Sequence, residues 1–335
     1  MYYKTILFTK APLLKAYRYR NVFQLVPIFY SQTAPFSKYA SHFPAFLEYV
    51  VDENAEEELD IVDTLRKCGI PENYILAGKS IPKQSQVRKE ILHLLTSLTN
   101  FQFFEYEVDD NHWGIRAPVD IDILNSEEKK LLNNQTSHWT IRSYVYSDLK
   151  RDLQITGFTD CKSYYKGTGE IYPYFTNNPH LEENHEIKMP PYLDSTLDRY
   201  YSMNVEDRNW VRQYVALLNQ GIDLFDSKRS VSLLSIISSI EGMAFLDYKK
   251  YGKTKGLGPK NRFLRFLRLY VSSNSEEKFK KYYEKRCEIA HEGVLFLSDI
   301  DLYANLTTQD EDWLFRLEVM QVARLALYNW LRREM

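Results

Sequence analysis

Arg286 and His291 form an R-x4-H motif in the C-terminal half of the chain, and Gly293 follows two residues later. Arginine carries a permanent charge on a planar fork of donors that suits phosphate oxygens, and histidine exchanges protons near neutral pH. Cleavage of RNA without a metal requires removal of the 2′-hydroxyl proton, neutralisation of charge on the phosphoryl oxygens, and protonation of the departing 5′-oxygen. Arg286 suits the second task, and His291 suits the first or the third.

The spacing of the two residues bears on how such a site would be assembled. In an α-helix each residue turns the chain by about 100°, so residues five apart lie about 140° from one another around the axis. We therefore expect each chain to supply half of a site that a second copy completes across a two-fold axis, the commonest arrangement in homo-oligomers. The structural alternatives are a helix cap for His291 and a surface ion pair of Arg286 with Glu284 or Glu288.

Basic residues are concentrated just before this motif. From Lys249 to Arg286 the chain has 13 Lys or Arg and three acidic residues, although its net charge is only -2. Such a concentration indicates a surface for a polyanion, and the alternative is a pair of helices with solvated basic edges. In the nucleic-acid interpretation, the residues expected to contact RNA are Lys260, Arg262, Arg265, Arg268, Lys281, Tyr282 and Lys285.

Glu241 is the only charged residue from Ser230 through Leu246. A carboxylate in so apolar a helix is costly to bury without a partner. The small residues Ser238, Gly242 and Ala244 would allow another helix to approach closely. Glu241 is therefore expected either to contact Arg286 or to lie on an exposed, serine-lined edge.

The elements that must position these residues fall into two groups. In residues 1–190 the pattern predicts strands at 4–9, 22–30 and 139–146, and helices at 55–67 and 85–98, which together make an α+β domain. Glycine, asparagine and proline interrupt every periodicity from 168 to 194, so the domain boundary is placed there. Residues 196–335 are predicted to form an all-α helical bundle.

Five helices are predicted in this bundle. The first three cover residues 206–225, 229–250 and 259–270, the third beginning with a proline at its first position. The fourth is expected to be capped by Asn274 with Glu277 and to end at Gly293, and the last to begin with a capping box of Thr308 and Glu311.

Other classes of protein lack support in the sequence. The three cysteines of this 335-residue chain, Cys68, Cys161 and Cys287, have no ligand or disulfide-framework spacing. The chain shows no glycine-rich phosphate loop and no carboxylate cluster with metal spacing, so no cofactor and no metal are expected. No segment reaches the length of a membrane span, and a soluble, cytoplasmic protein is expected.

The region from 205 to 331 resembles the HEPN superfamily, and within it the Apea-like HEPN domains. The resemblance depends on Tyr282, Arg286 and His291, with Glu241 as the counterpart of a glutamate on an earlier helix. Two positions depart from the family pattern. Cys287 stands where a polar residue often follows the arginine, and Glu292 separates His291 from Gly293.

The resemblance implies a metal-independent endoribonuclease that acts as a homodimer through the HEPN domain, in a toxin or antiphage defence system of the abortive-infection type. Arg286, His291 and Glu241 would be its catalytic residues. The N-terminal domain would then select substrate, inhibit the nuclease, or sense a phage-derived or small-molecule trigger. Two alternatives remain: a non-catalytic HEPN scaffold that binds nucleic acid or protein, and a regulatory protein whose HEPN half transmits a signal.

Overall fold

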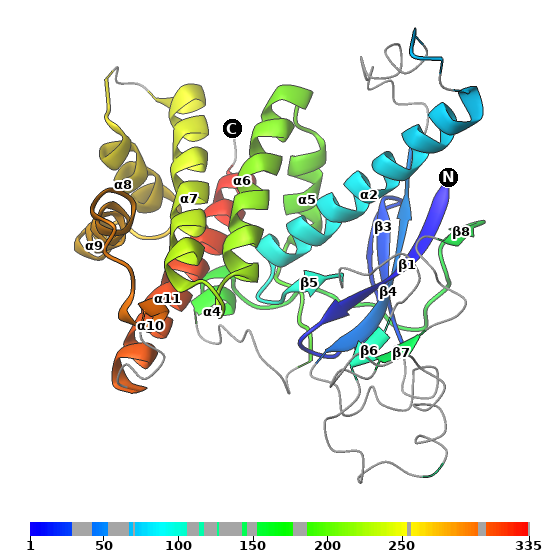
Figure 1. Ribbon diagram of the computed structural model, residues 1–335, viewed down its shortest axis with the longest axis horizontal. Helices are drawn as coiled ribbons and strands as arrows, with labels where there is room; N and C mark the ends of the chain where they lie inside the picture. The colour runs from blue at the N-terminus through cyan, green and yellow to red at the C-terminus, as the bar shows by residue number, and fades with distance from the viewer. Residues whose placement is uncertain are drawn as a thin grey trace. The chain divides into compact units, whose positions relative to one another are not determined.

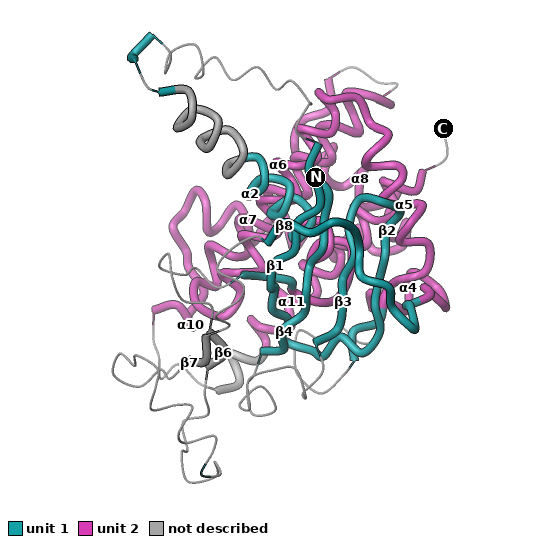
Figure 2. Tube along the Cα trace, turned by 90° about the vertical axis from the view of Figure 1, so that its right-hand side faces the viewer, with its two compact units in different colours: residues 1–92, 103–165, 182–188 teal, residues 93–102, 166–181, 189–335 magenta. Residues whose placement is uncertain are grey.

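The computed structural model describes residues 1–28, 42–52, 67–69, 71–105, 114–116, 126, 143–145, 153–176, 186–252, 256–300 and 306–333. The chain divides into two compact units (Figure 2). Unit 1 contains Met1–Leu92, Phe103–Tyr165 and Glu182–Lys188, and unit 2 contains His93–Gln102, Lys166–Leu181 and Met189–Met335. Two segments that the sequence assigned to the N-terminal domain, 93–102 and 166–181, thus belong with the helical unit.

Unit 1 is built on an antiparallel sheet. Its strands are β1 (Tyr2–Thr9), β2 (Tyr17–Tyr19), β3 (Phe23–Pro27), β4 (Phe43–Val50), β5 (Phe103–Phe104) and β8 (Leu153–Ile155). They are arranged in the order β2-β3-β4-β1-β5, and β8 also pairs with β1. A separate two-stranded ribbon joins β6 (Gly114–Arg116) to β7 (Ser143–Val145). Helix α2 (Glu72–Leu98) begins in this unit and ends in unit 2.

A fully buried carboxylate lies in the middle of this sheet. Glu48 on β4 is directly opposite Lys4 on β1 and Gln24 on β3. Lys4 Nζ is 3.2 Å from its carboxylate, Gln24 donates at 3.2 Å, and the backbone N–H of Thr159 donates at 2.7 Å. A buried charge is tolerated when it is paired and hydrogen-bonded in this way.

Unit 2 is helical. It contains α4 (Ile171–Thr176), α5 (Leu193–Tyr201), α6 (Val205–Asp223), α7 (Arg229–Tyr251), α8 (Pro259–Tyr270), α9 (Glu276–Cys287), the π-helical turn η2 (Glu288–Glu292), α10 (Leu297–Ile300) and α11 (Leu306–Arg332). Helix α7 lies at its centre, in contact with α6, α8, α9 and α11 (Figure 1). By length and composition α7 could cross a membrane, but 61% of its most apolar window is buried in the protein, which fits the core helix of a bundle.

Small residues allow α6 and α7 to pack closely, as the sequence suggested for this stretch. A Cβ added to Gly242 would lie 1.9 Å from the ring of Tyr214 on α6. The hydroxyl of Ser239 donates to the carbonyl of Tyr214 at 2.7 Å, and that of Ser232 donates to the carbonyl of Gly221 at 2.6 Å. The small residues thus serve contact between α7 and a helix of its own chain.

A second buried carboxylate joins the end of α7 to its neighbours. Asp247 accepts hydrogen bonds from Arg265 at 2.7 Å, Tyr270 at 2.7 Å, Trp330 at 3.2 Å and Arg333 at 3.3 Å. Its donors come from α8, α11 and the residue after α11, so one side chain connects three helices. The carboxylate also raises the pKa of the Tyr270 hydroxyl, for which burial is the larger cause.

The coarse prediction of an α+β part followed by a helical part is confirmed. The predictions of two helix caps were wrong. Asn274 lies in a turn, where its backbone N–H donates to the hydroxyl of Ser272, and α9 begins two residues later at Glu276. Helix α11 begins at Leu306, which places Thr308 inside the helix. The strand predicted at 22–30 is confirmed by β3, at Phe23–Pro27. The helix predicted at 55–67 lies almost wholly outside the described residues, as does much of the strand predicted at 139–146.

Candidate functional site

Arg286 and His291 lie together in a single chain. Nη1 of Arg286 is 3.0 Å from Nε2 of His291. The expected separation of about 140° around the helix is therefore wrong, and the reason is a change in helical winding. The α-helix ends at Cys287, and residues 288–292 form the π-helical turn η2.

The π turn accounts for the contact. Its hydrogen bonds join residues five apart, so residues at that spacing lie roughly one above the other instead of on different faces. Gly293 ends the turn in the left-handed conformation at φ 70°, as the sequence predicted for a glycine after the helix. The N–H of Val294 then donates to the carbonyl of Glu288 at 3.1 Å. The turn and its glycine thus convert the R-x4-H spacing into proximity.

Glu241 is the third member of the cluster. One oxygen of its carboxylate lies 3.3 Å from Nη2 of Arg286, and the two side chains are 19% and 23% exposed. Of the two alternatives posed by the sequence, the contact with Arg286 is the one that the structure contains. Helix α7 thus supplies the carboxylate that holds the guanidinium, and the guanidinium in turn contacts His291.

Tyr283 lies one turn before Arg286 on α9, and the sequence analysis did not identify it as a site residue. The guanidinium carbon of Arg286 lies 5.9 Å from the centre of its ring. Burial raises the pKa of Tyr283, and the nearby Glu241 carboxylate raises it further. Its position could have identified it, because residues three apart share a helix face and Tyr283 lies three residues before the predicted catalytic Arg286.

The contact bears on the tautomer of the imidazole. A guanidinium has donors and no acceptor, so a hydrogen bond between these atoms requires Nε2 of His291 to accept, and a neutral ring then carries its proton on Nδ1. His291 is exposed to solvent, whereas Arg286 and Glu241 are partly buried. The arrangement places an imidazole nitrogen and a positive charge side by side, with the imidazole at the surface. Such a pair can remove a proton and stabilise an anion at adjacent points.

Two residues expected to contact RNA have structural roles instead. Tyr282 is 1% exposed and packs against the rings of Phe279 and Phe315. Arg265 is bound to the buried Asp247 and joins α8 to α7. Both expectations are corrected, because the ring of Tyr282 is buried and the guanidinium of Arg265, which is 22% exposed, is held by Asp247.

The other basic residues remain at or near the surface, and most are paired. Lys260 lies 3.3 Å from Glu284, Arg268 lies 3.1 Å from Glu276, and Lys285 lies 3.0 Å from Glu288. The guanidinium of Arg262 lies over the rings of Phe245 and Tyr248, and Lys281 is exposed. The basic run is thus partly neutralised by local acids. Lys253 and Lys255, which belong to the same run, are outside the described residues.

Comparison of the chain with protein-family models, with curated proteins and with solved structures found no match. Within the described ranges, no group of three or more His, Cys, Asp or Glu side chains is arranged to hold a metal ion. What the chain can do chemically must therefore be argued from the Glu241–Arg286–His291 cluster itself.

Proposed function

We propose that the protein is a metal-independent HEPN endoribonuclease and that Arg286 and His291 cleave RNA by activating the 2′-hydroxyl. The observation that carries the proposal is the continuous contact from Glu241 to Arg286 at 3.3 Å and from Arg286 to His291 at 3.0 Å. It joins a fixed cation to a solvent-facing imidazole. Those are the two groups that the reaction requires beside each other.

The steps follow from the donors and acceptors of the cluster. A scissile phosphate would accept the hydrogen bond from Nη1 of Arg286 in place of His291, because a charged oxygen is a better acceptor than an imidazole nitrogen. Nε2 of His291 would then be free to remove the proton of the 2′-hydroxyl as it attacks phosphorus. The bond from phosphorus to the 5′-oxygen breaks, that oxygen receives a proton, and the products are a 2′,3′-cyclic phosphate and a 5′-hydroxyl. Glu241 holds the guanidinium throughout.

A homodimer would supply the second proton-transfer group. Apolar side chains lie exposed on the elements that carry the cluster: Phe245 on α7 is 42% exposed, and Val294 and Leu295 after η2 are 47% and 43% exposed. Exposed apolar residues of this kind are typical of interfaces when they gather on one surface. In a two-fold dimer one neutral His291 would take the 2′-hydroxyl proton, while His291 of the second copy, released from its own Arg286 and protonated, gives a proton to the leaving oxygen.

The biological setting belongs to the same proposal. A cytoplasmic, RNA-cleaving toxin of an antiphage system is what the resemblance to HEPN domains implies, and unit 1 would carry the response to a phage-derived or small-molecule trigger. The expected RNA contacts that lie at or near the surface are Lys260, Arg262, Arg268, Lys281 and Lys285. Their contribution would weaken with salt, because binding to phosphates releases counterions.

The test is cleavage of mixed RNA by the purified full chain in EDTA, with and without cell extract from phage-infected bacteria as a source of trigger. We expect wild type to cleave, Arg286→Ala to lose about 100-fold or more in rate, and His291→Ala to lose about 100- to 10,000-fold. Glu292→Gln is the matched control, since Glu292 is an exposed neighbour of His291 outside the cluster, and its rate should stay within about twofold of wild type.

Two results would count against the proposal. Equal cleavage by all four proteins would place the activity elsewhere or in a contaminant. RNA binding by wild type without cleavage under either condition would favour the non-catalytic scaffold.

A further inference from the structure

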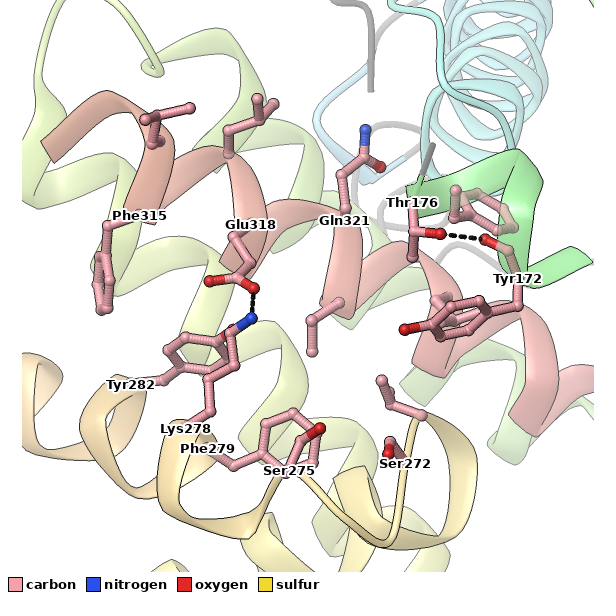
Figure 3. A pocket seen from close by; sticks show the side chains of 16 residues that line it. Tyr172, Thr176, Ser272, Ser275, Lys278, Phe279, Tyr282, Phe315, Glu318 and Gln321 are labelled. Carbon is pink, nitrogen blue, oxygen red and sulfur yellow. Dashed lines mark hydrogen bonds and ion pairs between the residues drawn. The ribbon is translucent and has the colours of Figure 1, made fainter. Parts of the chain in front are cut away.

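A pocket lies in unit 2 beside the buried side of α9, among α4, the turn between α8 and α9, and α11. Its volume is about 570 Å³. Figure 3 shows the side chains of Phe279 and Tyr282 on α9, and of Ser275 just before it, facing those of α11 and α4. The size falls within the range of roughly 300–1,000 Å³ that is typical of small-molecule sites.

The walls are rich in aromatic rings. Phe175, Phe279 and Tyr282 line the pocket and are each no more than 1% exposed, so their rings are fixed by the packing around them. Phe315 adds a further ring that packs edge-on against Tyr282. Rings held in place form a rigid aromatic wall and need little ordering when a planar ligand packs against it.

Two polar groups in the same walls have no partner among the described residues. These are the hydroxyl of Tyr282 and the side-chain amide of Gln321, whose nitrogen and oxygen are both unpaired. Gln321 is 5% exposed. A buried polar group without a hydrogen bond costs about 1–3 kcal/mol, so each calls for a partner. The several torsions of a glutamine side chain allow its amide to turn toward a bound molecule.

The charges at the pocket cancel. Lys278 and Glu318 both line it and form an ion pair with each other. The remaining lining residues are apolar, aromatic, hydroxyl or amide side chains. A charged ligand would have to leave water without an unpaired counter-charge to meet it, which disfavours anions and cations.

We propose that this pocket binds a neutral, planar aromatic molecule that carries an amide-like group with both a donor and an acceptor. The ring would lie among Phe279, Tyr282 and Phe315. The amide-like edge would bond to Gln321 after its side chain has turned from the direction shown in Figure 3. The inference depends on the pocket alone and holds whether or not the chain cleaves RNA.

Binding of naphthalene-2-carboxamide to the full chain tests the proposal, measured by saturation-transfer NMR beside 2-methylnaphthalene, which has no polar group. We expect saturable binding of the amide that is at least fivefold tighter than that of the hydrocarbon. Ser275→Trp should weaken binding at least tenfold by filling the pocket; Ser275 makes no side-chain cap bond at the start of α9, so its loss should not unfold the helix. Gln321→Leu should remove the preference for the amide.

The possible results of the binding experiment test different parts of the proposal. Absence of saturable binding, or binding that Ser275→Trp leaves unchanged, would overturn the site. Binding that Ser275→Trp blocks but that favours the amide equally in Gln321→Leu would overturn the assignment of Gln321 and with it the proposed ligand class. Circular dichroism of both variants establishes that they are folded.

Discussion

Replacing Glu241 by glutamine tests whether the carboxylate is required to hold Arg286. The substitution keeps the size of the side chain and removes its charge. At 3.3 Å, the gross attraction between the two charges is roughly 5 kcal/mol for an effective dielectric constant of about 20. Loss of hydration and of side-chain freedom offsets most of it, so the pair should contribute about 1–2 kcal/mol to the free energy of unfolding.

The assay compares Glu241→Gln with Glu276→Gln. Glu276 also pairs with an arginine, at 3.1 Å from Arg268, but those side chains are 38% and 47% exposed, and such a surface pair contributes at most about 1 kcal/mol. Urea denaturation should show a loss of about 1–2 kcal/mol for Glu241→Gln and less than about 0.5 kcal/mol for the control. RNA cleavage should fall about 10- to 100-fold only in Glu241→Gln, since 1.4 kcal/mol corresponds to tenfold. If the two variants match in both measurements, the supporting role of Glu241 is refuted.

Three further predictions concern the helical unit. Asp247→Asn should lower the free energy of unfolding by about 2–4 kcal/mol, because it leaves Arg265 facing a neutral group; a loss below about 0.5 kcal/mol in urea denaturation would contradict this. Gly242→Ala should cost about 1–3 kcal/mol, because the ring of Tyr214 must move, and an unchanged melting temperature would show that it moves freely. Stability should fall as pH rises above about 10, because burial raises the pKa of Tyr174 and of other core tyrosines, so the unfolded chain loses those protons first. A denaturation midpoint that stays constant from pH 8 to 11 would contradict that sign.

The helices were predictable because their signals are local. The stripe of apolar residues, the proline at the start of α8 and the glycine after η2 each act within a few residues, and these elements are found close to the predicted positions. The strands β2, β4, β5, β6 and β8 were missed. Four of them span two or three residues each, too few for an alternating pattern to be distinguished from a loop. The exception is β4, which has eight residues, but its buried positions do not alternate along the strand.

The site was predictable in its residues but not in its geometry. A charged side chain in an otherwise apolar helix is a signal in the sequence, and it pointed correctly to Glu241. The π-helical winding of residues 288–292 has no comparable signal in the sequence, since π turns have no simple pattern of residue types. The predicted separation of Arg286 and His291 assumed regular α-helix, and one wider turn reversed it.

Roles that depend on distant partners could not be read from spacing. Arg265 and Arg268 look alike along the helix, three residues apart in a basic stretch. One meets a buried carboxylate 18 residues earlier in the chain and the other meets an exposed glutamate. Tyr282 similarly follows a lysine-rich turn of the helix, yet its ring is buried in the core. Packing between helices decided each case.

The central claim, that Arg286 and His291 cleave RNA without a metal, is tested most directly by the chemical ends of RNA fragments formed in EDTA. Mass spectrometry of fragments made by wild type should find 2′,3′-cyclic phosphate and 5′-hydroxyl ends, and His291→Ala should yield none above background. Fragments with 3′-hydroxyl ends, cleavage that requires added Mg²⁺, or the same cyclic-phosphate fragments from His291→Ala would contradict the claim.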